Sequence, residues 1–243
     1  MMNCDTLLML GTDFPYQQFY PETATNAQID NQPEQIGRRT RVNIGLVVDV
    51  KATLQALVPK LDSKVQHYQE ARRRLDDLAT EVPGKKPIHP QFVAKVLNKL
   101  ASEDAIFSCN VGTPTIWATR YFEMNGKRRL LGSFNHGSMA SALPQAIGAQ
   151  LTFPGRQVIT LSGDGGLAML MGDILSLKQL DFPVKIVVFN NGSLGFVELE
   201  MKAAGFLDYR TELHNPNFAK VAKAIGLLGI RIEYPEDLVD GLK

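Results

Sequence analysis

The stretch Val158-Ile159-Thr160-Leu161-Ser162-Gly163-Asp164-Gly165-Gly166 begins with an apolar, β-branched run and ends in a glycine cluster. Such a run is typical of a buried parallel strand. Apolar residues then recur at helical spacing from Leu167 to Leu180, and Pro183 stops that pattern. A second β-branched run, Val184 to Phe189, ends in Asn190-Asn191-Gly192. The sequence therefore predicts a right-handed strand–helix–strand unit whose parallel strands end at the same edge of a sheet.

Polar groups follow both predicted strands. Asp164 supplies a carboxylate and Asn191 an amide oxygen, and the main-chain carbonyl of Ser193 offers a third oxygen. Magnesium prefers hard oxygen ligands and is usually shared between protein and phosphate. We therefore expect Asp164, Asn191 and Ser193 to bind magnesium.

The glycines beside Asp164 suit a phosphate. Gly163, Gly165 and Gly166 carry no Cβ, so the backbone can approach an anion closely, and the next helix begins there with free N–H groups. The alternative is that Gly-Asp-Gly and Asn-Asn-Gly are ordinary turns. Because one strand–helix–strand unit joins both halves, a magnesium–diphosphate site is favoured. Neither a Walker loop nor a Gly-x-Gly-x-x-Gly fingerprint is present.

Composition excludes several classes of function. The chain has 243 residues and a net charge of +1, so charge gives no argument for nucleic acid or an acidic membrane. Cys4 and Cys109 are expected to be reduced and buried. No signal peptide or membrane-spanning run is recognisable, so a cytoplasmic location is expected.

Two α/β parts joined by a charged linker are predicted, at residues 1–61, 62–89 and 90–243. The first part has strand-like runs at Thr6 to Leu10, Ala27 to Ile29 and Ile44 to Val48, then a helix from Asp49 to about Leu61. The linker holds a helical stretch, 66–79, and Pro83-Gly84-Lys85-Lys86-Pro87. The alternation in the last part predicts a doubly wound parallel sheet, so the fold class is α/β. Both ends of the chain read as cut from a longer protein.

Long segments resemble thiamine-diphosphate enzymes of the pyruvate oxidase, acetolactate synthase and decarboxylase family. The resemblance covers nearly the whole chain and is strongest to pyruvate oxidases, including quinone-dependent pyruvate dehydrogenases. It rests on Gly163-Asp164-Gly165 with Asn190-Asn191, and on the runs that begin at Leu10, Ile88, Asn110, Gly132 and Asn191. Residues 1–61 look like part of the family's central FAD-binding domain, and residues 90–243 look like most of its C-terminal diphosphate-binding domain.

The resemblance implies roles for particular residues. Asp164, Asn191 and the Ser193 carbonyl would bind magnesium. Met139 would support the bent coenzyme, as suits a large unbranched apolar side chain. Residues that would contact the coenzyme are Gly137, Ser138, Met139, Gly163, Asp164, Gly165, Gly166, Asn191 and Phe196; Val111, Met139 and Phe196 would flank the reacting centre. FAD contacts would come from Thr12, Asp13, Phe14, Pro15, Tyr16, Asp30 and Asp49.

The implied activity is oxidative decarboxylation of pyruvate to acetate or acetyl phosphate and carbon dioxide, with electrons passing to a quinone or oxygen. Thiamine diphosphate, Mg²⁺ and FAD would be the cofactors, and a homotetramer the usual assembly. The family's N-terminal pyrimidine-binding domain, with its activating glutamate, has no counterpart here, so we expect the chain alone to be inactive. The resemblance also implies a C-terminal tail for peripheral membrane association, which we expect to lie outside this chain.

Two alternatives remain open at this stage. An acetolactate synthase-like carboligase shares the coenzyme motif and the FAD domain. A non-catalytic cofactor-binding fragment is the other alternative, and it belongs to a different functional class.

Overall fold

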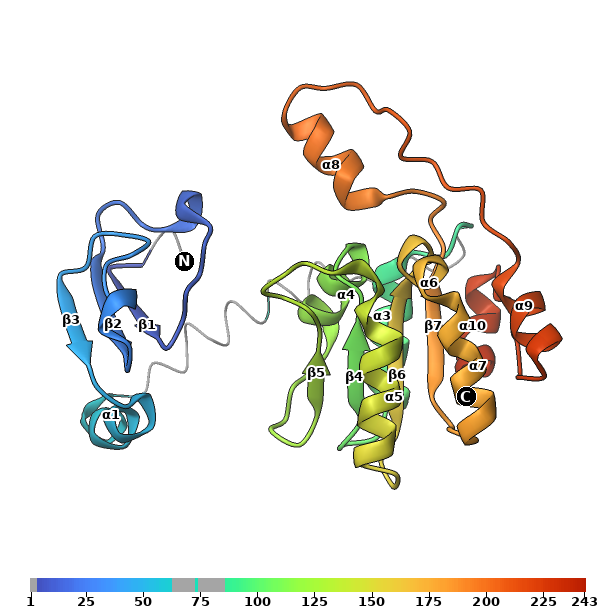
Figure 1. Cartoon of the computed structure of the whole chain (residues 1–243), viewed down its shortest axis with the longest axis horizontal. Coiled ribbons are helices and arrows are strands. Elements are labelled where there is room, and N and C mark those ends of the chain that lie inside the picture. Colours follow the sequence, from blue (N-terminus) through green and yellow to red (C-terminus); the bar gives the residue numbers. More distant parts are fainter. Residues whose placement is uncertain (1–3, 63–72, 74–85) are drawn as a thin grey trace. The chain divides into compact units, whose positions relative to one another are not determined.

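The computed structural model describes residues 4–62, 73 and 86–243, and the chain divides into two compact units, residues 1–68 and 69–243 (Figure 1). Apart from Arg73, the predicted helical stretch 66–79 lies outside the described residues, as does most of the predicted linker 62–89. No helix within the described ranges combines the length and hydropathy that a membrane crossing requires.

The first unit is built on three parallel strands in the order β1-β2-β3: β1 (Thr6–Leu10), β2 (Thr25–Asp30) and β3 (Ile44–Val47). Helix α1 (Val50–Leu57) follows β3, and the Oδ1 of its N-cap Asp49 accepts a hydrogen bond from Ala52 N at 2.7 Å. The predicted cap is therefore confirmed. The helix ends before the predicted Leu61 because Pro59 cannot donate the N–H that would continue it, and a 3₁₀ turn, Val58–Lys60, takes over.

The second unit is a parallel sheet in the order β5-β4-β6-β7. Its strands are β4 (Ile106–Cys109), β5 (Arg129–Leu131), β6 (Val158–Gly163) and β7 (Lys185–Phe189). The innermost strands, β4 and β6, pair with Cys109 beside Leu161. Because all pairs are parallel, β4, β6 and β7 end at the same edge.

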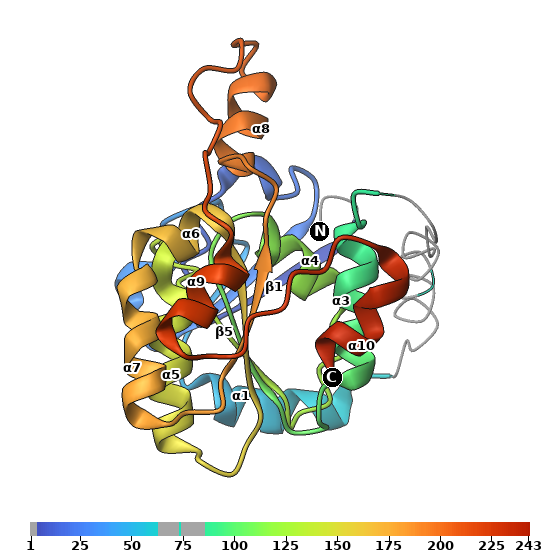
Figure 2. The same cartoon turned by 90° about the vertical axis from the view of Figure 1, so that its right-hand side faces the viewer.

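Helices cover both faces of this sheet, as a doubly wound fold requires, so the predicted fold class is confirmed. Figure 2 shows α5, α7 and α9 on one side of the strands and α3, α4 and α10 on the other. The helices of this unit are α3 (Pro90–Leu100), α4 (Thr113–Tyr121), α5 (Ala142–Thr152), α6 (Asp164–Met169), α7 (Ile174–Leu180), α8 (Gly195–Ala203), α9 (Phe218–Ile225) and α10 (Leu238–Leu242).

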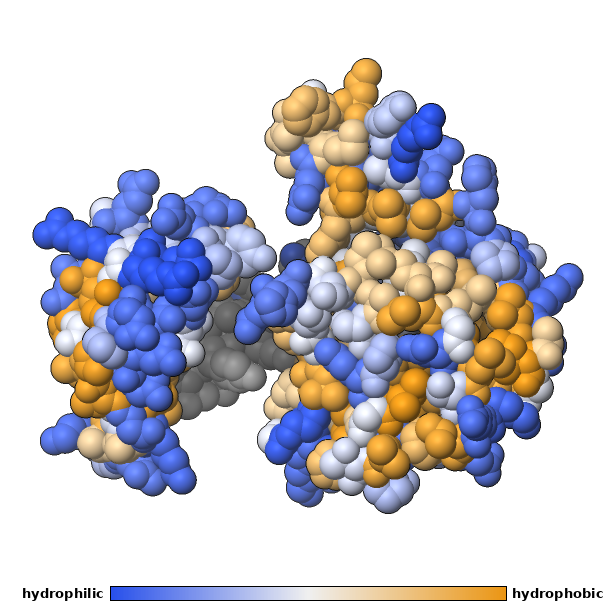
Figure 3. Space-filling view, viewed as in Figure 1, coloured by the Kyte–Doolittle hydropathy of each residue, from blue (hydrophilic) through white to orange (hydrophobic). Residues whose placement is uncertain are grey.

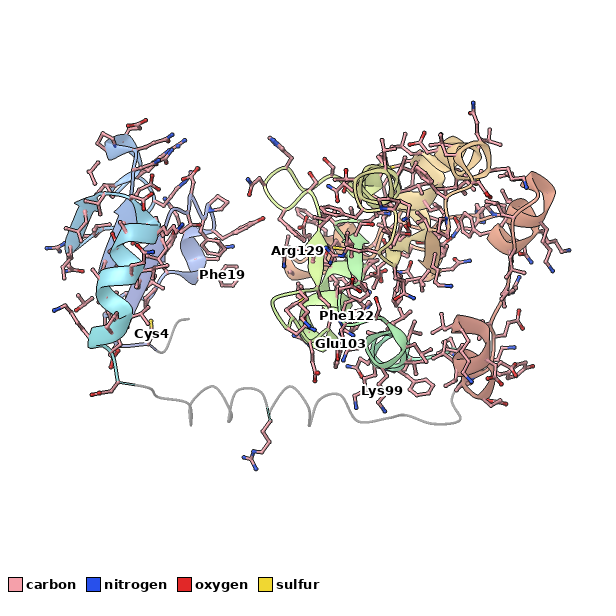
Figure 4. All side chains as sticks on the ribbon, turned by 90° about the horizontal axis from the view of Figure 1, so that it is seen from below. Cys4, Phe19, Lys99, Glu103, Phe122 and Arg129 are labelled. Atoms are coloured by element: carbon pink, nitrogen blue, oxygen red, sulfur yellow. The ribbon has the colours of Figure 1, made fainter. Side chains whose placement is uncertain are left out.

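Apolar side chains fill the space on both faces of the sheet. On the α3 side, Phe107 of β4 packs against Phe122 with ring centroids 4.4 Å apart (Figure 4). On the other side, Leu167, Ile174 and Leu177 form a buried cluster with residues of β7 packed against it. These contacts hold β6 and the helix after it rigidly, which fixes the edge where the polar residues lie.

The prediction of one helix from Leu167 to Leu180 is wrong. The structure has α6, a 3₁₀ turn Met171–Asp173, and α7, because Leu170 leaves helical geometry at φ −126° and ψ 36°. Gly172 in this turn is a poor helix former. Helix α6 begins directly at Asp164, so the glycines that follow lie in its first turn.

Helix α8 stands away from the sheet in Figures 1 and 2, and none of its residues is buried. Apolar side chains gather on α8 and on the chain after it (Figure 3), including Phe206 and Leu207. The chain then returns to the sheet edge, where Ser193 and Glu212 form an antiparallel bridge. That bridge brings residues 211–215 beside the ends of β6 and β7.

Candidate functional site

Asp164 is the centre of the polar edge of the second unit. It follows β6 directly, and only 2 % of its surface is exposed. Its Oδ1 accepts a hydrogen bond from Gly165 N at 3.0 Å, and its Oδ2 accepts one from Gly192 N at 2.7 Å. The second bond joins the ends of β6 and β7, so the structure brings the two predicted halves of the site together.

Asn191 lies beside Asp164 on the neighbouring loop. It is exposed, and its Oδ1 accepts a bond from Ser193 N at 3.3 Å, long enough to leave this oxygen accessible to a stronger partner. Ser193 is fixed by its bridge to Glu212, and Leu194 N donates to Thr211 O at 2.8 Å. A loop held in this way can present oxygens without rearrangement.

The oxygen atoms at this edge suit a hard cation as ligands. Within the described part of the chain, no three His, Cys, Asp or Glu side chains gather to hold a metal ion. A cation here would use one carboxylate, that of Asp164, with the Asn191 amide oxygen and the Ser193 carbonyl as neutral ligands. Magnesium tolerates so few protein ligands because it keeps waters and phosphate oxygens in its shell.

The glycines after Asp164 form a crowded cradle. A Cβ on Gly166 would lie 2.3 Å from Asn110 Nδ2 and 2.9 Å from Met139 O. A Cβ on Gly165 would lie 3.1 Å from Leu213 Cδ1 and 3.3 Å from Met139 Cε. The absence of side chains is therefore required by the site, which leaves main-chain N–H groups as donors to an anion.

Met139 belongs to the same cluster. Its methyl group points to Gly165, and it begins the 3₁₀ turn Met139–Ser141 that leads into α5. Ser138 O accepts a bond from Val111 N at 3.4 Å, which links the end of β4 to this turn. Met139 therefore lies against Gly165, and the bond from Val111 to Ser138 holds the residue before Met139 to the end of β4.

Phe196 and Gly137 are less closely tied to this cluster. Phe196 lies in the first turn of α8, next to Gly195. A Cβ on Gly195 would lie 3.1 Å from both Asn191 Nδ2 and Thr113 Cγ2, so the start of α8 adjoins the magnesium-ligand candidates and α4. Gly137 is exposed, and its N–H donates to Ser133 O at 2.7 Å.

A charged group lies on α8 close to Asn191. Ser193 Oγ donates to Glu198 Oε2 at 3.0 Å, and Lys202 Nζ contacts Glu198 Oε1 at 2.5 Å. Lys202, and then Ser193, hold the pKa of Glu198 below its usual value. Glu198 is therefore an anion that helps to fix Ser193, and it is not a proton donor near neutral pH.

Sequence reasoning did not assign three residues of this edge: Asn110, Leu213 and Asn215. Asn110 directly follows β4, and its Oδ1 accepts from Ala142 N at 2.9 Å, so the rule that found Asp164 and Asn191 could have found it. Leu213 and Asn215 come from the chain after α8. No strand pattern or motif marks them, because the bridge between Ser193 and Glu212 brings them to the site.

The predicted FAD residues lie in the first unit, where Asp30 ends β2 and Thr12 to Tyr16 follow β1. Most of their polar groups already have partners. Asp13 pairs with Arg39 Nε at 2.6 Å, Asp30 Oδ1 accepts from Gln32 N at 3.0 Å, and Asp49 caps α1. The aromatic rings of Phe14 and Tyr16 lie 5.2 Å apart, in a cluster with Phe19, which Figure 4 labels, and Tyr20. Thr12 and Pro15 are exposed.

A cavity of about 530 Å³ in the first unit lies elsewhere. It is lined by Gln17 and by the residues that lead into β2 and β3, including Tyr20, Asn26, Arg39 and Arg41. None of the predicted FAD residues lines this cavity. The sequence prediction for FAD therefore still rests on the family resemblance of these segments.

Most of the chain matches families of known proteins. Residues 110–243 match the family described as thiamine pyrophosphate enzyme, C-terminal TPP binding domain, and residues 1–57 match its central domain. A relative from Bacillus subtilis, YdaP, is named as a thiamine pyrophosphate-containing protein. It is 36% identical over 98% of this chain and 43% of its own length.

Two further relatives carry different names. Pyruvate oxidase of Lactiplantibacillus plantarum is 28% identical over 99% of this chain and 42% of its own length. Acetolactate synthase of Mycobacterium bovis is 30% identical over 99% of this chain and 42% of its own length. The chain thus spans about two fifths of the curated relatives it matches.

Proposed function

The chain belongs to the thiamine pyrophosphate-dependent enzymes, and from this premise we propose that the edge formed by β4, β6 and β7 holds thiamine diphosphate with Mg²⁺. The observation that carries the proposal is the pairing of Asp164 with its glycine cradle. Asp164 is buried yet uses Oδ1 only for its neighbour's N–H, which leaves acceptor capacity for a cation. The donor set and the cradle fit a magnesium–diphosphate group.

Each residue then has a defined task. Asp164 supplies the negative charge that binds Mg²⁺, and Asn191 Oδ1 and the Ser193 carbonyl complete the protein share of the shell. Gly165 and Gly166 would line the diphosphate, and the main-chain N–H of Gly166 would donate to its oxygens, because that of Gly165 already donates to Asp164 Oδ1. Met139, whose methyl group points to Gly165, provides an apolar surface that supports and orients the coenzyme.

When bound, thiamine diphosphate supplies a carbon nucleophile and electron sink for cleavage beside a ketone carbonyl. The chain contributes binding and orientation around it. Val111 and Phe196 would flank the substrate and exclude water. No acid or base is assigned to this edge, since Glu198, the nearest carboxylate on α8, is committed to Lys202 and Ser193.

We propose pyruvate as the substrate and oxidative decarboxylation as the reaction of the protein that this chain represents. Support comes from the resemblance of Phe134-Asn135-His136-Gly137-Ser138-Met139 and of residues 191–197 to pyruvate oxidases. An acetolactate synthase-like carboligase is the second candidate, because that relative is as similar to the chain as the pyruvate oxidase is.

FAD is proposed for the first unit with less structural support. Asp30, Asp49 and Thr12 to Tyr16 lie where three parallel strands end, as a dinucleotide site requires. The carboxylates of Asp13, Asp30 and Asp49 are already committed to Arg39, Gln32 and Ala52.

Calorimetry on the full chain tests the coenzyme site. Thiamine diphosphate is titrated with and without Mg²⁺ into the chain, into Asp164→Ala, and into Asp173→Ala, a matched loss of an acid in the next turn. We expect magnesium-dependent binding that disappears only in Asp164→Ala. Equal binding without magnesium, or unchanged binding by Asp164→Ala, refutes the assignment.

Product analysis tests the reaction. The chain is incubated in air with pyruvate, inorganic phosphate, thiamine diphosphate, Mg²⁺ and FAD, and products are identified by NMR. Acetate or acetyl phosphate supports the oxidative reaction, and acetolactate supports the carboligase. Coenzyme binding without any product is the result expected if the chain alone is inactive.

A further inference from the structure

Asn215 connects the two strand ends that carry the proposed magnesium ligands. It lies between α8 and α9, far from Asp164 in sequence, and is half-buried. Its Nδ2 donates to Asp164 Oδ2 at 2.7 Å and to Asn190 Oδ1 at 3.0 Å. A side-chain amide nitrogen carries two hydrogens, so both are used in these bonds. Asn215 therefore bridges the end of β6 and the end of β7.

The two oxygens of Asp164 are used unequally. Oδ2 accepts from Gly192 N and from Asn215 Nδ2, each at 2.7 Å. Among the residues that the structure describes, Oδ1 accepts only from Gly165 N, at 3.0 Å. Bonds to a carboxylate are charge-assisted and strong, so the pair on Oδ2 sets the orientation of the group. Oδ1 is the oxygen left for a cation.

We propose that Asn215 is a positioning residue for cation binding: it anchors Asp164 Oδ2 so that Oδ1 is presented to Mg²⁺. This proposal rests on the proposed coenzyme site. The chemistry of the amide suits the task. It donates hydrogen bonds but carries no charge, so it orients the carboxylate without neutralising it, whereas a lysine here would compete with the cation.

Anchoring groups of this kind affect affinity without touching the metal. Hydrogen bonds to a ligating carboxylate fix its geometry, and their removal typically lowers metal affinity by about 10–100-fold. In Asn215→Ala, Asp164 would keep its charge and the Gly192 bond but would lose one anchor. The expected result is a roughly 10–100-fold rise in the Mg²⁺ concentration that supports coenzyme binding.

A merely structural role must be separated from this one, because Asn215 also ties the chain after α8 to the sheet. The molecule offers a matched control two residues further on. Asn217 is the N-cap of α9, and its Oδ1 accepts from Lys220 N at 3.0 Å. Asn217→Ala therefore removes a hydrogen bond from the same connection without touching Asp164, and lowers stability through the lost cap.

The experiment measures binding of thiamine diphosphate to the full chain by calorimetry across a Mg²⁺ series, for wild type, Asn215→Ala and Asn217→Ala. Thermal midpoints are recorded without ligands. We expect Asn215→Ala to shift the Mg²⁺ dependence, whereas Asn217→Ala lowers the thermal midpoint and leaves the Mg²⁺ dependence of wild type. Asn215→Ser, which keeps one donor, should fall between wild type and Asn215→Ala, and it serves as the test if Asn215→Ala does not fold.

Several results would overturn the proposal. An unchanged Mg²⁺ dependence in both Asn215 variants contradicts it. Equal shifts of the Mg²⁺ dependence in Asn215→Ala and Asn217→Ala would mean that Asn215 only holds the loop in place. Tighter Mg²⁺ binding in Asn215→Ala would mean that the amide occupies the place of the cation. If wild type itself shows no magnesium-dependent binding, the proposed function fails, and the role of Asn215 fails with it.

Discussion

Replacement of Gly166 by alanine adds a single methyl group, yet it should disturb the packing of the candidate site strongly. The new Cβ would lie 2.3 Å from Asn110 Nδ2 and 2.8 Å from Asn110 Cγ, both closer than real contacts allow. It would also lie 2.9 Å from Met139 O, a main-chain atom that cannot rotate away. Asn110 must therefore move, and its buried bond to Ala142 N, 2.9 Å long, breaks with it.

The cost can be worked from these contacts. Overpacking of a filled site costs about 1–3 kcal/mol. A buried donor or acceptor left without a partner adds roughly 1–3 kcal/mol. Alanine is a better helix former than glycine by up to about 1 kcal/mol, which offsets part of this loss. We expect the free energy of unfolding of the second unit to fall by roughly 2–4 kcal/mol.

Urea unfolding followed by tryptophan fluorescence measures this loss in the correct unit. Trp117 is the one tryptophan of the sequence, and it packs against the core beneath α3 and α4. With a slope of roughly 2–3 kcal/mol per molar urea, the midpoint should shift by about 1 M. Gly172→Ala is the matched control, because a Cβ there meets nothing within 4 Å.

Equal stability of Gly166→Ala and Gly172→Ala would refute the packing argument. Addition of Asn110→Ala to Gly166→Ala should restore part of the stability that the Gly166→Ala substitution removes. The recovery should be incomplete because Met139 O remains 2.9 Å from the new Cβ. Additive losses in this double-mutant cycle would mean that the two side chains do not compete for space.

Arg128→Met should lower the free energy of unfolding by about 2–4 kcal/mol in the same urea assay. The reason is that the buried guanidinium donates to carbonyls at the end of α3, including Ala101 O at 2.9 Å. A loss below about 0.5 kcal/mol would contradict this reasoning. Arg39 lowers the pKa of Asp13 below 3.8, so the stabilising contribution of this pair is present above about pH 4 and is lost as pH falls through the folded-state pKa. An NMR titration should show the Asp13 pKa rise in Arg39→Gln, with the smaller lowering by Arg38 retained, and an unchanged value would exclude Arg39 as the main cause. Burial raises the pKa of the Cys109 thiol above 9.0. Iodoacetamide at pH 8 should therefore modify Cys4 faster than Cys109 in the folded chain, and both thiols at the same rate in guanidinium. Equal rates in the folded chain would contradict the burial of Cys109.

The sequence predicted β6 and β7 of the second unit well because both are short runs rich in β-branched residues with glycine or proline beside them. The boundaries of the helix after β6 were predicted less well. Periodicity alone joined Leu167 to Ile174, since both lie on one apolar face, but the backbone breaks at Leu170 between them. A pattern of apolar residues shows which side chains are buried without showing whether one helix carries them.

The sequence predicted which residues share the sheet edge where they follow a strand end, and it missed those that tertiary contacts bring to that edge. Asp164 and Asn191 follow parallel strands, so their meeting could be inferred from connectivity. Asn215 follows no strand, and a bridge between Ser193 and Glu212 delivers it to Asp164. In the first unit, Asp49 shows a further limit, because one carboxylate at a strand end serves as a helix cap whether or not it meets a ligand.

Paramagnetic line broadening by Mn²⁺ tests the central claim most directly, since Mn²⁺ substitutes for Mg²⁺ among oxygen ligands and broadens nearby amide signals even when it binds weakly. With thiamine diphosphate present, the amide signals of Gly165, Gly192 and Ser193 should broaden first. The amide of Arg129 in β5, which Figure 4 labels, should stay sharp. Broadening around exposed acids such as Glu103, with Gly165 and Gly192 unaffected, would contradict a cation site at Asp164.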